Sequence, residues 1–343
     1  MIRRFDSDRS FGREWTGRAI SIERRPKLGD AAGAMLDRGG ITTAAERIAP
    51  YLRRTPVLAL ESAAFGLPGR LSLKLEFLQV TGSFKPRGAF NRLLSARIPP
   101  AGVIAASGGN HGIAVAHVAR RLGVPATIFV PTIAAPAKLQ RIRDSGAEVA
   151  IAGATYAEAL AASTARAEAT GALVVHAYDQ PEVILGQGTL GLELMEQAPG
   201  LDSVLVAVGG GGLIAGIALA YAGRGTRVIG VEPVLAPTLH DALAAGRPVP
   251  VAVSGLAADS LGAREAGALA FDISRDHVER VLLVEDEAIR IAQRALWREL
   301  RIVVEPGGAA AVAALLAGHH RALPGESIGI VLCGANTDPA SVP

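Results

Sequence analysis

The 343-residue sequence is poor in cysteine and in aromatic side chains, and both shortages restrict what it can do. Its single cysteine, Cys333, excludes an internal disulfide and fits a reducing cytoplasm. Aromatic residues make up only 4%, so a stacking platform for nucleic acid bases is not expected. The amino terminus has no apolar stretch of the kind that a signal peptide needs.

A basic excess is also absent outside the first 39 residues. Residues 1–39 contain nine Lys or Arg and six Asp or Glu, whereas the whole chain contains 35 and 32. The remaining residues therefore carry 26 of each and no net charge. We expect no nucleic acid partner, and we expect residues 1–39 to form a flexible basic tail.

One stretch of 20 residues, Val204–Gly223, carries no charge and has the length of a membrane span. Four consecutive glycines interrupt it at 209–212, and their backbone groups would be left without partners in lipid. The pattern predicts a buried strand, a glycine loop and a buried helix, with no membrane partner.

The rest of the chain alternates short apolar strands with helices. In its middle we predict strands at 103–106, 126–130, 149–151 and 173–175, and helices at 110–122, 138–144 and from a cap at Thr155 to about 170. A second block has strands at 201–208, 227–231 and 327–332 and helices at 213–221 and 287–300. This rhythm predicts an α/β fold of two parallel-sheet lobes, each a doubly wound three-layer α/β/α unit, with a cleft between them. We expect a large cofactor-binding domain at 40–98 and 176–343 and a small domain at 99–175.

Residues 81–89, Thr-Gly-Ser-Phe-Lys-Pro-Arg-Gly-Ala, follow a predicted strand at 71–75. Lys85 lies between Phe84 and Pro86, just before a predicted helix, which is not the setting of a freely exposed lysine. A partly desolvated lysine has a lowered pKa and can form a Schiff base. A surface lysine in a loop is the plainer interpretation.

Two further loops join a strand to the start of a helix, where backbone N–H groups favour an anion. Ser107-Gly108-Gly109-Asn110-His111-Gly112 would suit a carboxylate, or could be a simple turn capped by Asn110. Gly209 to Leu213, with four glycines, would let amides surround a phosphate, although its spacing also allows a dinucleotide.

The final strand leads into Cys333-Gly334-Ala335-Asn336, where a buried cysteine usually serves packing. The seven histidines do not have metal-ligand spacing, and His319 and His320 are expected in a solvated loop. Given the spacing of the histidines, no metal is expected. The sequence also has no paired-carboxylate signature and no Ser/His/Asp signature.

Taken together, the segments TGSFKPRGA, SGGNHG, GGGGL, VEP (231–233), EPGGAA (305–310) and CGAN resemble the threonine/serine dehydratases. These are pyridoxal-phosphate enzymes of the tryptophan synthase β-subunit fold, fold type II. The resemblance spans residues 41 to 338. Chance does not explain six motifs in this order.

The resemblance implies a role for each loop. Lys85 matches the lysine that holds pyridoxal 5′-phosphate, and Phe84 the residue packed on its ring. Asn110 matches the side chain that binds the ring 3′-oxygen, and Cys333 the residue that faces the pyridine nitrogen. The phosphate cradle matches Gly209, Gly210, Gly211, Gly212 and Leu213, and the substrate carboxylate loop matches Ser107, Gly108, Gly109, Asn110 and His111.

Three departures from the family pattern are visible. Cys333 replaces a usual serine and, as a thiolate, could favour a protonated ring. Gly108 stands where serine racemases have a second catalytic serine. Thr238 stands near Glu232, where cation-binding relatives have an aspartate, which argues against a bound Mg²⁺ or Mn²⁺. The regulatory domain of biosynthetic threonine dehydratases would have to follow CGAN, and the chain ends there.

We therefore expect a cytoplasmic, homodimeric lyase that removes water and ammonia from an L-serine- or L-threonine-type amino acid. Serine, threonine, 3-hydroxyaspartate and phenylserine all match the motifs. An amino-acid synthase of the same fold and a serine racemase remain alternatives. A nicotinamide-dependent oxidoreductase, with Glu232 on the ribose, and a non-catalytic binding protein are further ones.

Overall fold

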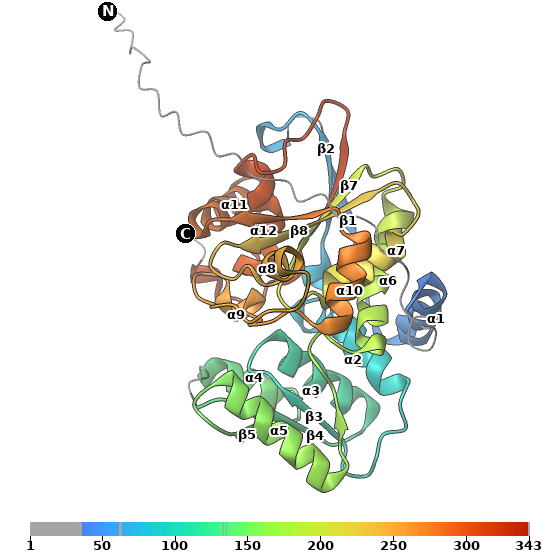
Figure 1. Ribbon diagram of the computed structural model, residues 1–343, viewed down its shortest axis with the longest axis vertical. Helices are drawn as coiled ribbons and strands as arrows, with labels where there is room; N and C mark the ends of the chain where they lie inside the picture. Colours follow the sequence, from blue (N-terminus) through green and yellow to red (C-terminus); the bar gives the residue numbers. More distant parts are fainter. Residues whose placement is uncertain (1–35, 62–63, 133, 135, 342–343) are drawn as a thin grey trace, which may run out of the picture.

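The computed structural model describes residues 36–61, 64–132, 134 and 136–341, and it has two lobes (Figure 1). The larger lobe is built on a six-stranded sheet in the order β1-β2-β10-β7-β8-β9. These strands are Val57–Leu60, Arg70–Lys74, Ser327–Val331, Ser203–Ala207, Arg227–Pro233 and Arg280–Val284. All neighbours run parallel except β1, which pairs antiparallel with β2 at the edge. Most of the predicted flexible tail, residues 1–35, lies outside the described residues.

Helices cover both faces of this sheet. Helices α6 (Pro181–Gln197) and α7 (Gly212–Tyr221) pack together on one face, with α10 (Ala268–His277) against α7. Helices α11 (Asp286–Leu300) and α12 (Pro306–Leu316) pack on the other. Helices α8 (Thr238–Ala245) and the short α9 (Ala258–Leu261) follow β8. None of the helices within the described ranges is long and apolar enough to span a bilayer.

The smaller lobe has a four-stranded parallel sheet in the order β5-β4-β3-β6. Its strands are Val103–Ala106 (β3), Ala126–Val130 (β4), Glu148–Ile151 (β5) and Leu173–Val174 (β6). Alternation within β3 separates its side chains: Val103 and Ala105 join a core with α3 (Asn110–Leu122), whereas Ile104 and Ala106 pack on the side of α5 (Tyr156–Thr170). The helix α4 (Pro136–Asp144) completes this lobe. The predicted doubly wound architecture is confirmed, because each sheet lies between helices.

Local signals account for several boundaries. Thr155 caps α5 as predicted: its hydroxyl accepts from the N–H of Glu158, and the Glu158 carboxylate accepts from the N–H of Thr155 at 3.1 Å. Helix α7 is apolar on all sides and every one of its residues is buried, which is why its sequence resembled a membrane span. The strand predicted at 201–208 is shorter, because Leu201 and Val208 lie beyond the ladder.

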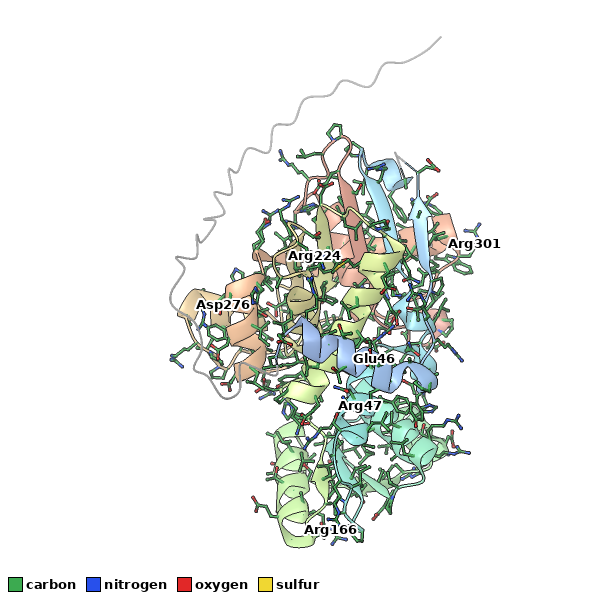
Figure 2. The ribbon with its side chains drawn as sticks, turned by 90° about the vertical axis from the view of Figure 1, so that its right-hand side faces the viewer. Glu46, Arg47, Arg166, Arg224, Asp276 and Arg301 are labelled. Carbon is green, nitrogen blue, oxygen red and sulfur yellow. The ribbon has the colours of Figure 1, made fainter. Side chains whose placement is uncertain are left out.

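The two lobes meet along α1 (Arg38–Ile48) and α2 (Lys85–Leu94). Arg47 of α1 lies at this junction in Figure 2, and its guanidinium donates to the Asn91 side-chain oxygen of α2 at 2.6 Å. Ala89, Phe90 and Leu93 of α2 belong to the apolar core of the small lobe. Helix α2 lies before the predicted domain boundary at residue 99, and it shares this core with elements that come after the boundary. The domain boundaries stay a prediction.

Candidate active site

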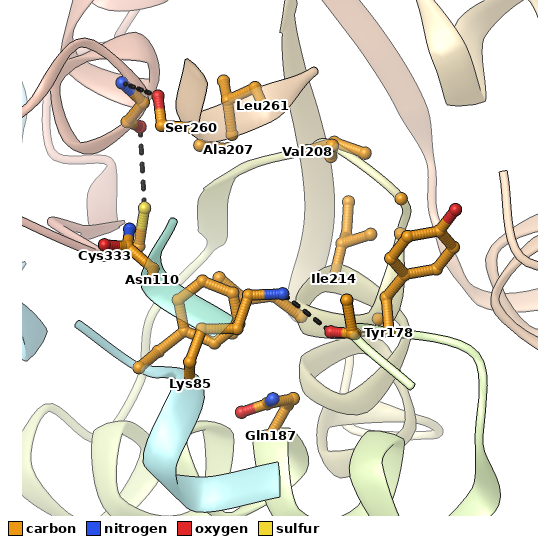
Figure 3. Close-up of a pocket in the computed structure, with 18 of the residues that line it drawn as sticks. Lys85, Asn110, Tyr178, Gln187, Ala207, Val208, Ile214, Ser260, Leu261 and Cys333 are labelled. Carbon is orange, nitrogen blue, oxygen red and sulfur yellow. Dashed lines mark hydrogen bonds between the residues drawn. The ribbon is translucent and has the colours of Figure 1, made fainter. Parts of the chain in front are cut away.

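Three parallel strands end at the same cleft, and each leads into one of the loops predicted to carry chemistry. Strand β3 leads into residues 107–112, β7 into the glycine loop, and β10 into Cys333 and Asn336. In parallel sheets ligands bind beyond the carboxyl ends of the strands. A cavity lies there, and Figure 3 shows its lining. The predicted residues among that lining are Phe84, Lys85, Asn110, Gly209, Gly210, Gly211, Gly212, Leu213 and Cys333.

Lys85 is the first residue of α2, and its side chain enters this cavity. Its ammonium donates to the backbone oxygen of Ala177 at 2.7 Å and lies 5.0 Å from the centre of the Phe84 ring. Desolvation lowers the pKa of Lys85 to about 8, although Cys333 and Glu305 act in the opposite direction. A lysine with this pKa is partly neutral near pH 7.5, so it can act as a nucleophile or a base.

The glycine loop fits a phosphate because there is no room for side chains in it. A Cβ on Gly210 would lie 2.4 Å from ring carbons of Tyr178, and one on Gly212 would lie 2.6 Å from the Tyr178 carbonyl oxygen. Gly211 has a φ of +93°, a conformation that favours glycine. The loop opens directly into the first turn of α7, whose N–H groups have no partner within the helix. Bare backbone and a helix amino terminus form a cradle for an anion.

The loop 107–112 lies at the start of α3, and Asn110 is its one residue in the lining of this cavity. The structure does not bring the predicted substrate residues Ser107, Gly108, Gly109 and His111 into that lining. The hydroxyl oxygen of Ser107 accepts from the N–H of Gly109 at 3.2 Å, which holds the turn closed. Gly108 has no positive φ, and among the described residues the nearest atom to a Cβ there is the Cβ of Ala134, at 3.6 Å. The His111 ring is buried in the small lobe with Nε2 2.8 Å from the oxygen of Val175, so only its backbone is available to a ligand. The carboxylate-binding role of residues 107–111 stays a prediction.

Cys333 is buried on the far side of the cavity, and its thiol donates to the backbone oxygen of Gly307 at 3.6 Å (Figure 3). Burial raises the pKa of this thiol, and the neighbouring Glu305 acts in the same direction. The neutral thiol is therefore the stable form. A thiolate, one of the possibilities that the sequence suggested, is disfavoured.

Glu232 does not serve a ribose. It is fully buried, and its two carboxylate oxygens accept from the N–H groups of Leu239 and His240 at 2.7 and 2.9 Å, at the start of α8. The Thr238 hydroxyl donates to the backbone oxygen of Ala263 at 2.7 Å. Glu232 therefore caps the amino terminus of α8. A nicotinamide-dependent oxidoreductase would need this residue to bind the ribose, so that alternative is not supported. Across the described ranges, no group of His, Cys, Asp and Glu is arranged to hold a metal.

The prediction for His320 was wrong. Its ring is buried, with Nε2 3.3 Å from the Glu326 carboxylate and Nδ1 3.3 Å from the guanidinium of Arg280. Ser203 and Arg227 also donate to that carboxylate, at 3.1 and 2.6 Å. His319 is exposed, as expected.

Comparison with known proteins places the chain in a family. Residues 48–334 match the family of pyridoxal-phosphate dependent enzymes, and the chain belongs to it. The glycine cradle and Lys85 in one cavity fit that cofactor.

Individual relatives show which enzymes of this family the chain is similar to. The chain is 42% identical to an L-threonine ammonia-lyase of Geobacter sulfurreducens, over 88% of this chain and 76% of the relative. It is 38% identical to a phenylserine dehydratase of Ralstonia pickettii, over 89% and 94%. Its structure is similar to that of maize serine racemase, with a TM-score of 0.85 and 35% identity over 89% of this chain and 95% of that one.

The sequence reasoning missed several residues that line the cavity: Ala177, Tyr178, Gln187, Ser260, Leu261 and Glu305. Glu305 begins the segment EPGGAA, and its carboxylate accepts from the Asn110 amide at 2.7 Å, a contact that the sequence does not indicate. Ala177 and Tyr178 come shortly after strand β6, and no pattern in the sequence around them indicates that they line a site. Gln187 lies in the middle of α6 with its carbonyl oxygen buried and without a protein partner.

Proposed function

We propose that this protein eliminates water from an L-β-hydroxy amino acid, and that the enamine it releases takes up water again to give a 2-keto acid and ammonia. The observation that carries the proposal is the Lys85 amine, which has a lowered pKa and lies in the same cavity as the glycine cradle. When bound, pyridoxal phosphate is held by Lys85 and withdraws electrons from the substrate's Cα. The cradle at 209–213 would hold its phosphate, and Phe84, Asn110 and Cys333 its ring.

Lys85 acts twice in this proposal. It would hold the cofactor, and with its amine free it would take the proton from Cα of the substrate. A pKa of about 8 suits this role, because a general base works best when its pKa is near the operating pH. The Ala177 carbonyl, now 2.7 Å from Nζ, can accept a hydrogen bond from the ammonium that results.

Residues 107–111 would orient the substrate through its carboxylate, using N–H groups at the start of α3. The β-hydroxyl would then leave from Cβ as water, with a proton supplied from the phosphate site at residues 209–213. The neutral thiol of Cys333 would give the pyridine nitrogen an uncharged partner, which limits stabilisation of negative charge at Cα and favours prompt elimination over transamination.

A panel of L-serine, L-threonine, 3-hydroxyaspartate and phenylserine tests the proposal, with keto acid and ammonia measured in parallel. We expect equal amounts of both products from at least one of them. The printed activities of the Geobacter and Ralstonia relatives make threonine and phenylserine the first two to assay. Absence of keto acid from all four would refute the proposal.

Racemisation is the second candidate, because of the similarity to maize serine racemase. A racemase needs an acid on the face of Cα opposite the lysine. At the position where the resemblance implies such a hydroxyl, this chain has Gly108 and no side chain. We therefore rank elimination first. Chiral chromatography of the remaining substrate distinguishes the two activities.

We also propose that the enzyme works as a homodimer in the cytoplasm. The family resemblance supports the dimer, and the single cysteine, buried and reduced, supports the compartment. Light scattering coupled to size-exclusion chromatography measures the first, and fractionation of cells the second.

A further inference from the structure

The side chain of Asn336, in the loop after β10, is hydrogen-bonded on three sides. Its Oδ1 accepts from Nη2 of Arg141, a residue of α4 in the small lobe, at 2.5 Å. Its Nδ2 donates to the backbone oxygen of Thr81 at 2.8 Å and to Oδ1 of Asn110 at 2.6 Å. One amide therefore connects the small lobe, the loop before Lys85 and a residue of the cavity wall.

The chemistry of its partners fixes which way this amide points. A guanidinium only donates and a backbone carbonyl only accepts, so Asn336 must turn its oxygen to Arg141 and its NH₂ to Thr81. The same NH₂ reaches Asn110, which must therefore present its own oxygen. The NH₂ of Asn110 is then left on the other side, where it donates to Oε1 of Glu305 at 2.7 Å and borders the cavity.

The loop before Lys85 is shaped around the Asn336 side chain. Gly82 has a φ of +78°, and a Cβ there would lie 2.6 Å from Oδ1 of Asn336. Thr81, whose carbonyl receives the Asn336 amide, has the left-handed φ of 68°, which is uncommon for a threonine. The space and the backbone conformation at 81–82 thus match this one amide.

We propose that Asn336 is a positioning residue that turns the NH₂ group of Asn110 toward the cofactor ring. Without this contact, the Asn110 amide could rotate and present its oxygen to the ring oxygen, an arrangement of two acceptors. The inference rests on the cofactor role proposed for Asn110.

The test is Asn336→Asp, which keeps the size of the side chain and removes both N–H donors. Asn110 would then have to donate to the new carboxylate and to Glu305 at once, from opposite ends of its amide, which it cannot do. We expect the dissociation constant for pyridoxal phosphate to rise roughly tenfold or more, as for a lost hydrogen bond to a charged group. The absorption spectrum of the bound cofactor should shift as well.

A double-mutant cycle separates positioning from general damage to the fold. Asn110→Ala should weaken cofactor binding to a similar extent, and adding Asn336→Asp to it should change the constant by less than about twofold. Arg141→Met is the matched control: it removes the outward contact, while the Thr81 carbonyl still accepts from the Asn336 NH₂ and fixes the direction of the amide, so the cofactor constant and spectrum should stay near those of the parent.

Two results would overturn the inference. One is Asn336→Asp binding the cofactor like the parent. The other is a double variant whose dissociation constant for the cofactor rises by the product of the two single effects, because Asn336 would then act independently of Asn110. None of these measurements requires turnover, so a protein inactive on every β-hydroxy amino acid would lose the proposed function and still test this one.

Discussion

Replacement of Gly210 by alanine is the most direct test of the glycine cradle. The new Cβ would lie 2.4 Å from Cγ and Cδ1 of Tyr178 and 2.5 Å from Cε1. Carbon atoms in contact rest about 3.5–4 Å apart, so the loop or the ring must move by about 1 Å. Gly210 has no positive φ, so the alanine backbone itself is not strained and the effect is steric.

The Tyr178 ring has little freedom to retreat. Its hydroxyl donates to the backbone oxygen of Glu265 at 3.2 Å, and its ring packs edge-on against His176 at 4.7 Å between centres. The displacement should therefore fall mainly on the cradle. Overpacking of this kind costs about 1–3 kcal/mol, which corresponds to a roughly 5- to 150-fold weaker cofactor affinity.

The assay is titration of the apoprotein with pyridoxal phosphate, followed by absorbance. Gly108→Ala is the steric control, because its Cβ would lie at least 3.6 Å from every described neighbour and the cofactor affinity should hold. Tyr178→Ala combined with Gly210→Ala removes the obstructing ring and should recover most of the loss. Gly210→Ala with parental affinity would show that this loop is not the cradle, and no recovery in the double variant would show that the clash is not the cause.

Four further outcomes follow from the site. Lys85→Ala should fold and bind the cofactor without a covalent bond to the protein, and its keto-acid production should fall by at least about 10³-fold; normal turnover would contradict the central assignment. Cys333→Ser should keep its activity, whereas Cys333→Asp should protonate the ring and increase side products, measured as the product ratio; an unchanged ratio in the Asp variant would mean that Cys333 does not face the ring nitrogen. Gly108→Ser should raise the racemised fraction seen by chiral chromatography, since the φ of Gly108 is not positive and the nearest described atom to a Cβ there is 3.6 Å away; abundant D-isomer from the parent protein would favour the racemase instead. Burial lowers the pKa of His111 to about 3, so the folded protein holds the neutral ring, and protonation in the unfolded chain should cost stability as the pH falls below 6.5, by roughly 1 kcal/mol at pH 5.5; thermal unfolding of His111→Gln should depend less on pH over this range.

The parts of the molecule that the sequence predicts well are those set by local pattern. The strands at 103–106 and 126–130 and the helix at 110–122 have their predicted bounds, because apolar alternation, glycine and proline mark both ends. Loops that follow buried parallel strands must meet at one edge of a sheet. Lys85, Asn110 and the glycine loop therefore came together in one cavity as expected.

The mistaken and missing assignments share a different cause. His320 looked like part of a solvated loop, yet a carboxylate from residue 326 and a guanidinium from residue 280 surround it. Glu232 had the right spacing for a ribose, but the N–H groups of the following helix use both its oxygens. In each case the role depends on which partners the fold supplies, and spacing along the chain does not contain that information.

Asn336 shows the same limit within a motif. The sequence Cys-Gly-Ala-Asn identifies the loop, but it does not predict the direction in which the side-chain amide of Asn336 points. That direction is set by Arg141, 195 residues earlier in the chain, and by the carbonyl of Thr81, 255 residues earlier. Asn336 donates to the oxygen of Asn110, and the NH₂ of Asn110 donates to Glu305, so the direction of the Asn110 amide at the cavity depends on a contact outside the cavity lining. An active site of this kind is defined by its lining residues together with the contacts that orient them.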